Sequence, residues 1–231
     1  FHLTVLHKPL FRLFCSEAYQ YAHRGTIHQY QMEVERFDGF SGPIILQIAD
    51  RQNKDLDGVE ILETTIPAGE NKVLLPLHLP ETMHINVQAH SNVYAQGIAY
   101  FKDSLGKDQS TCIVSEMRCM IRTLPTVARL HADHDEIQFA PDGQASCSLR
   151  LERTSLFGGP LTIELVPEAF TNGITAEPAV IPAGEKEAIV KLRAAPGAKI
   201  IQNAPLRLRG TGDLGSGTTV VTEAQVFVHG K

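Results

Sequence analysis

Apolar and polar residues alternate with a period of two along much of this chain, which is the pattern of half-buried β-strands. Residues 29–35 and 146–152 both show it, as do the stretches 44–48, 161–165, 73–77 and 188–192. No stretch carries a helical period with capping residues. The pattern predicts an all-β fold in which each strand buries one face. The inward positions are Tyr30, Met32, Val34, Ile44, Leu46, Ile48, Val73, Leu75, Leu77, Cys147, Leu149, Leu151, Leu161, Ile163, Leu165, Ala188, Val190 and Leu192.

The same unit occurs twice. Residues 32–48 align with residues 149–165, and the segment IPAGE recurs at 66–70 and 181–185. An ordered internal repeat of this kind indicates two homologous domains. The shared residues are Arg12/Arg129, Glu35/Glu152, Arg36/Arg153, Phe40/Phe157, Gly42/Gly159, Pro43/Pro160 and Gly58/Gly173.

Glycine and proline clusters separate the strands at short intervals. About seven short strands per copy with such turns predict two tandem immunoglobulin-like β-sandwiches. We place them at residues 9–124 and 125–231, and we interpret residues 1–8 as the closing strand of a preceding repeat or as an N-terminal strand. In IPAGE, proline and glycine favour a turn that leads into the next strand. The repeated glycines and prolines are therefore interpreted as maintaining the fold.

Composition narrows the function classes. The 231 residues are 43% hydrophobic and carry a formal net charge of −5. No apolar run approaches the roughly 20 residues of a membrane-spanning helix, so no membrane insertion is expected. Binding to nucleic acid needs a basic face, which the acidic balance disfavours. The chain contains no recognised nucleophile, phosphate-loop or metalloprotease motif, so we do not expect an enzyme.

The order Arg-x-x-x-Phe-x-Gly-Pro, a hydrophobic strand, a turn glycine and Ile-Pro-Ala-Gly-Glu resembles the Ig-like repeat modules of large secreted bacterial proteins. Planctomycete proteins that carry such tandem sandwiches beside pre-peptidase-type domains are a notable example of this family. It implies a non-catalytic module that is secreted, periplasmic or displayed at the cell surface. Its implied partners are other protein domains or copies of the same array. The first copy departs from the family pattern at residues 50–58, DRQNKDLDG.

That departure is the first candidate site. Asn53, Asp55 and Asp57 precede Gly58 with the spacing of a calcium-binding loop, and Glu60 follows. Thr64 stands where such a loop carries its bidentate glutamate. The alternative is a solvated loop with Asx-turns. Apart from a calcium ion at this loop, we predict no cofactor for this chain.

The second candidate is the segment HADHDE, in which His131, Asp133 and His134 offer ligands for zinc or another transition metal. A spacing of three places the two histidines on opposite faces of a strand. A polar linker edge is therefore the competing interpretation.

The four cysteines are not repeated between the copies. Cys147 occupies an inward position and is interpreted as a small core residue. Cys112 and Cys119 are expected on opposite faces of one strand. A bridge from Cys15 to either of them stays open in an oxidising compartment.

These patterns leave three hypotheses for function. The first is a structural or interaction module for assembly, spacing or adhesion. The second is a ligand-binding module for carbohydrate or a surface polymer; aromatic stacking then places its site in the first domain, which holds all five tyrosines. The third is an accessory domain pair of an enzyme or redox complex, because sandwiches host unrelated functions.

Overall fold

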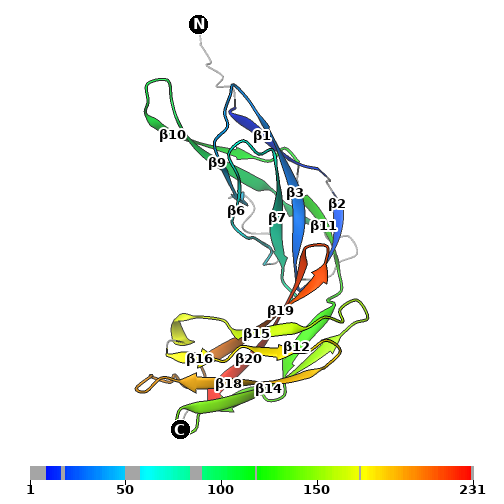
Figure 1. Ribbon diagram of the computed structural model, residues 1–231, viewed down its shortest axis with the longest axis vertical. Helices are drawn as coiled ribbons and strands as arrows, with labels where there is room; N and C mark the ends of the chain where they lie inside the picture. The colour runs from blue at the N-terminus through cyan, green and yellow to red at the C-terminus, as the bar shows by residue number, and fades with distance from the viewer. Residues whose placement is uncertain are drawn as a thin grey trace. The chain divides into compact units, whose positions relative to one another are not determined.

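The structure is a computed structural model that describes residues 9–16, 19–49, 58–83, 90–117, 119–171 and 173–229. These residues form strands, turns and one 3₁₀ turn, η2 (Ala169–Thr171) (Figure 1). The prediction of an all-β fold is confirmed. Within the described ranges, no helix is long and apolar enough to cross a membrane.

The chain divides into two compact units. The described residues up to Ala22 form the first unit together with His28–Leu124, and the second contains His23–Ile27 and the chain from Pro125 onward. In the second unit, Thr26 pairs with Val220. A boundary at 124/125, predicted from the repeat, does not anticipate the short segment His23–Ile27.

The first unit contains three sets of paired strands. The first set has the order β1 (Phe11–Cys15), β3 (Thr26–Arg36), β7 (Lys72–Leu79), β5 (Glu60–Ile61). The second has the order β10 (Asp108–Val114), β9 (Ala95–Lys102), β4 (Ile44–Ile48), β6 (Thr64–Ile66). The third has the order β2 (Tyr19–His23), β11 (Cys119–Leu124), β8 (His90–Val93).

The second unit has two sheets. One has the order β12 (Ala128–Ala132), β14 (Gln144–Arg153), β18 (Glu187–Ala194), β16 (Ile174–Ala176). The other has the order β17 (Ala179–Ile181), β15 (Leu161–Leu165), β19 (Pro205–Gly215), β20 (Thr218–His229), and β13 (Glu136–Gln138) pairs in parallel with β20.

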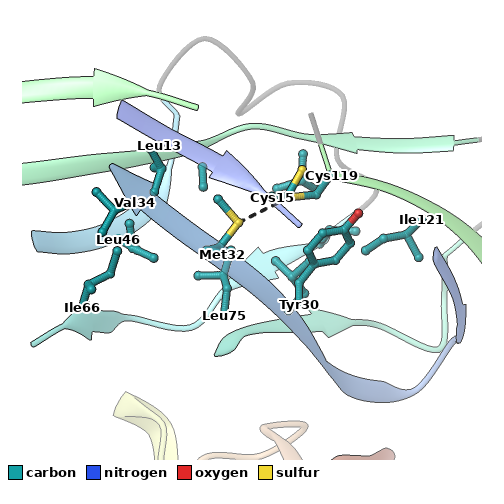
Figure 2. Packing of buried hydrophobic residues seen from close by; sticks show 14 of the residues in the cluster. Leu13, Cys15, Tyr30, Met32, Val34, Leu46, Ile66, Leu75, Cys119 and Ile121 are labelled. Atoms are coloured by element: carbon teal, nitrogen blue, oxygen red, sulfur yellow. Dashed lines mark hydrogen bonds between the residues drawn. The ribbon is translucent and has the colours of Figure 1, made fainter. Parts of the chain in front are cut away.

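Each unit buries its own hydrophobic core, and the predicted inward residues form much of both. In β3, Tyr30, Met32 and Val34 are buried, and Figure 2 draws them in one hydrophobic cluster with Leu75 of β7. Of the predicted inward positions, four are only partly buried and pack against the cores: Ile48, Val73, Leu165 and Ala188. The arrangement is sandwich-like, because the apolar faces of paired sheets are buried together.

Candidate functional site

The repeated arginine of the first unit ties two loops together. Arg36 is the last residue of β3, and its Nη1 donates to the Gly42 carbonyl (2.6 Å), before β4. Nη2 donates to the Pro67 carbonyl (3.1 Å) and to the Glu70 carbonyl (2.9 Å), both in the turn between β6 and β7. The guanidinium carbon lies 5.5 Å from the centre of the Phe40 ring. We call these five residues the arginine cluster of the first unit.

The second unit repeats this cluster with the matching residues. Arg153, the last residue of β14, donates through Nη1 to the Gly159 carbonyl. It also donates through Nη2 to the Pro182 carbonyl and through Nε to the Glu185 carbonyl, both at 3.0 Å. Its guanidinium carbon lies 5.1 Å from the centre of the Phe157 ring. Two independent copies of one contact set show that the repeated residues act together.

The cluster joins connections between sheets. The loop from β3 to β4 and the turn from β6 to β7 each run from one sheet to another. A hydrogen bond from the Gly69 N–H to the Ser41 carbonyl (2.9 Å) adds a backbone link, and the Gly184 N–H donates to the Gly158 carbonyl (3.3 Å) in the second unit. Gly69 has φ = 80° and Gly184 has φ = 79°, a conformation that favours glycine. These contacts explain why IPAGE recurs.

Partial burial lowers the pKa of Arg36 and of Arg153, because it removes water from the charged guanidinium. Both remain cationic, since the ordinary arginine pKa is far above neutral pH. Their donors point at backbone carbonyls of their own unit. Each arginine cluster therefore links two loops of its unit by hydrogen bonds, and we call this link the brace.

A second repeated feature was missed at the sequence level. Gly97 of β9 pairs with Leu46, and Gly210 of β19 pairs with Ile163, the matching residue of the second copy. A Cβ on Gly97 would lie 2.8 Å from Ile44 Cγ2, and the same atom on Gly210 would lie 2.4 Å from Leu161 Cδ2. The residues on either side of the two glycines differ between the copies, so the sequence does not reveal this match.

The predicted calcium residues Asn53, Asp55 and Asp57 lie outside the described residues. Glu60 is described: it starts β5, and its side chain is exposed. Its Oε2 lies 3.8 Å from Nδ1 of His78 on the neighbouring strand β7. The calcium loop stays a prediction.

The structure places the residues of the predicted histidine cluster in a strand and in the turn that follows it. His131 lies in β12, with its Nε2 3.5 Å from a carboxylate oxygen of Glu152 on β14. Asp133 and His134 fall in the turn after β12, and the Asp133 N–H donates to the Ser148 carbonyl (3.0 Å). Among the residues that the structure describes, no three His, Cys, Asp or Glu side chains are grouped to hold a metal ion. The metal interpretation of His131, Asp133 and His134 therefore gains no geometric support.

The structure places three of the cysteines for which the sequence made predictions. Cys147 is buried in the second core, as predicted, and this burial raises its pKa to about 11, with a smaller effect of the Asp133 charge. Cys112 is exposed on β10. Cys119 lies on a separate strand, β11, so the expectation that it shares one strand with Cys112 is wrong. The strand ends between them at Ser115, whose hydroxyl donates to the Met117 carbonyl.

Tyrosine exposure bears on the carbohydrate hypothesis. Tyr30 is fully buried, whereas Tyr21 and Tyr100 are 57% and 67% exposed. Tyr21 lies on β2 with its ring edge-on to Tyr19, and Tyr100 lies on β9. The exposed rings thus occur on different sheets of the first unit.

The second unit has an open hollow of about 800 Å³ at the end of β15 and beside η2. Its lining includes Leu165, Glu168 and Ile174. Glu168 also forms an ion pair with Arg207 of β19. No sequence pattern indicated this hollow.

Ion pairs, unlike the arginine clusters, differ between the units. Arg12 of β1 donates to both carboxylate oxygens of Glu116, through Nε at 2.5 Å and through Nη2 at 2.6 Å. In the second unit, Glu223 instead accepts from Arg207 (3.3 Å) and Arg209 (2.7 Å). Arg129, which matches Arg12, is exposed.

The Arg12–Glu116 pair predicts a pH dependence. Hydrogen bonding to Arg12, then its charge, hold the pKa of Glu116 below the ordinary value of 4.5. The pair therefore stabilises the folded state above the pKa of the unfolded chain, and this contribution is lost as pH falls through the lower, folded pKa. We expect Glu116→Gln to be less stable than the parent at pH 7, and the difference to vanish in acid. Thermal unfolding across a pH series measures it.

Glu63→Gln, which removes another exposed carboxylate, supplies the control for the loss of one surface charge. In Arg12→Gln, the Glu116 pKa measured by carboxyl NMR should rise toward its ordinary value. A Glu116 pKa that is the same with and without Arg12 would refute the assignment. Salt should weaken the effect, since both side chains are about half exposed.

Comparison with known proteins gives little. No known protein family and no curated protein matches the sequence. Similar solved structures are Rst D1-D2 (12% identity, TM-score 0.27, 96% of this chain and 100% of that one) and a protein of unknown function from Porphyromonas gingivalis W83 (10%, 0.27, 95% and 100%). A third is the YadV chaperone (10%, 0.30, 94% and 100%). Similarity this low carries no argument about function.

Proposed function

We propose that this chain is a pair of immunoglobulin-like β-sandwiches that serves a larger secreted, periplasmic or cell-surface protein as a non-catalytic module for assembly, spacing or adhesion. The strand order of the second unit supports the fold. Its sheet β12-β14-β18-β16 matches the ABED sheet of an immunoglobulin domain, and β15, β19 and β20 match strands C, F and G.

The first unit supports the same assignment. Its order β1-β3-β7-β5 repeats the ABED arrangement, and β4, β9 and β10 correspond to strands C, F and G. The strands β8 and β11 pair with each other. Along the chain, β8 comes shortly before β9, and β11 comes shortly after β10. The two units thus differ by interruptions in the last two strands.

The single observation that carries the functional proposal is the duplicated arginine cluster. Both copies retain the residues that brace the loops, including Arg36 and Arg153, while the ion pairs and exposed tyrosines outside the clusters differ. A duplication that retains the framework and varies the surface suits repeated modules whose task is to hold a spacing or to present surfaces to protein partners.

Native mass spectrometry of the full chain purified from its source, with and without EDTA, tests this proposal. A bare single chain supports a spacer, and copies of the chain or bound partner chains support assembly. A retained small molecule, or an ion of about 40 Da that EDTA removes, would contradict the proposal and favour a ligand-binding module supported by calcium.

A further inference from the structure

Two cysteine side chains meet inside the first unit. Cys15 is the last residue of β1 and Cys119 the first of β11. They are 2% and 0% exposed. Their side chains share a hydrogen bond, and Figure 2 shows the two sulfurs next to each other. The chain thus brings two thiols into contact across about 100 residues of sequence.

The neighbourhood of the pair is apolar and well packed. Cys15 lies opposite Met32 in the pairing of β1 with β3, and the Cys119 sulfur lies 3.9 Å from the Met32 sulfur. Cys119 lies opposite Val93, which is fully buried. Because β1 and β11 belong to different sets of paired strands, a bond between the two sulfurs would join those sets directly.

The pair is specific to the first unit. Ala132 occupies the position of Cys15 at the end of the matching strand β12. Cys112, whose pairing with Cys15 the sequence left open, is exposed, whereas the thiol that contacts Cys15 is buried. The geometry therefore decides between the two pairings.

We propose that Cys15 and Cys119 form a disulfide that links the two sets of strands when the chain folds in an oxidising compartment. A dissolved or protein-borne disulfide supplies the oxidant. One cysteine thiolate attacks that disulfide, forms a mixed disulfide and releases a first thiol. The second cysteine loses its proton, attacks the mixed disulfide and releases a second thiol, so two protein thiols are oxidised while one disulfide is reduced to two thiols.

The hydrogen bond between the two thiols is a second sign of their contact. It lowers the pKa of Cys15, because the Cys119 thiol donates to the Cys15 thiolate, and the same bond followed by burial raises the pKa of Cys119. Since both sulfurs are buried in the folded unit, we expect the bond to form during folding, before β1 closes over the core, and either thiolate can then attack first.

Refolding of the full chain tests the proposal. The variant Cys112→Ser/Cys147→Ser, which retains only the proposed pair, is unfolded, reduced and refolded with glutathione disulfide. It is then unfolded again and alkylated. We expect no alkylation and a mass about 2 Da below the reduced chain, because two hydrogens are lost. The same sample reduced with dithiothreitol should take two alkyl groups. Two alkylated cysteines, or two glutathione adducts, after oxidative refolding would overturn the proposal.

Two further measurements identify which cysteines are linked and how much the link stabilises the first unit. In the parent chain with all four cysteines, peptide mapping without reductant should yield a Cys15–Cys119 linkage, and a Cys15–Cys112 linkage would refute the proposal. In the pair-only variant, oxidation should raise the thermal midpoint of the first unit by about 5–15 °C over the reduced form. Adding Cys15→Ser should abolish this shift and leave one alkylated cysteine. An unchanged midpoint in a chain shown to be oxidised would refute the link between the sets of strands.

Discussion

Arg153→Ala is expected to lower the free energy of unfolding of the second unit by about 2 kcal/mol. The substitution removes the donors to the carbonyls of Gly159, Pro182 and Glu185. It also removes the cation beside the Phe157 ring, a contact worth up to about 1 kcal/mol where water reaches it. Hydrogen exchange resolved by peptide measures the loss in this unit, with the first unit as internal reference.

Arg150 provides the matched control, because it lies on the same strand β14 and its side chain is exposed. Arg150→Ala should change protection by no more than about 0.5 kcal/mol. Arg153→Lys should be nearly as destabilising as Arg153→Ala, since a lysine ammonium lacks the planar fork that reaches three carbonyls. Equal effects of Arg150→Ala and Arg153→Ala would show that the brace contributes nothing.

Gly210→Ala should destabilise the second unit by about 1–3 kcal/mol through overpacking. The new methyl group would overlap Leu161, which is fully buried. The side chain of Leu161 must then leave its packed position or β15 must shift from β19. The midpoint of denaturant unfolding, followed by signals of the second unit, measures the cost.

Gly158→Ala is the control, because a Cβ at that glycine meets nothing within 4 Å. The double variant Gly210→Ala/Leu161→Ala gives a sharper test. Removing the overlapping atoms should make the double cost smaller than the sum of the two single costs. Strict additivity would mean that the methyl group of the alanine does not meet Leu161.

The strand pattern was readable because it depends on local alternation. Residues 30–34 bury every second side chain, as do residues 147–151, and both stretches were predicted from period two alone. Burial of one sheet face forces this pattern on the sequence, so the all-β fold follows from it. The pairing of Thr26 with Val220 could not be predicted in this way, because nothing in the residues around Thr26 indicates it.

The candidate site was only half predictable. The repeat identified Arg36 and Arg153 as shared, but their donors go to backbone carbonyls, which have no residue type for a sequence to reveal. The contact of Cys15 with Cys119 depends on how the first and last strands of a unit meet, so the sequence left two pairings open. The calcium residues Asn53, Asp55 and Asp57 lie outside the described residues and keep their status as a prediction.

The placement of the arginine clusters bears on how such a domain tolerates change. Each cluster fixes the connections at the end where β4 begins and β6 ends. The two copies differ in length in the segment after β4, which leaves from the other end of that strand. A longer connection at that end costs little entropy and leaves the arginine cluster in place. A designer who wishes to graft a recognition peptide onto this scaffold would therefore insert it after β4 or β15 and leave the IPAGE turn untouched.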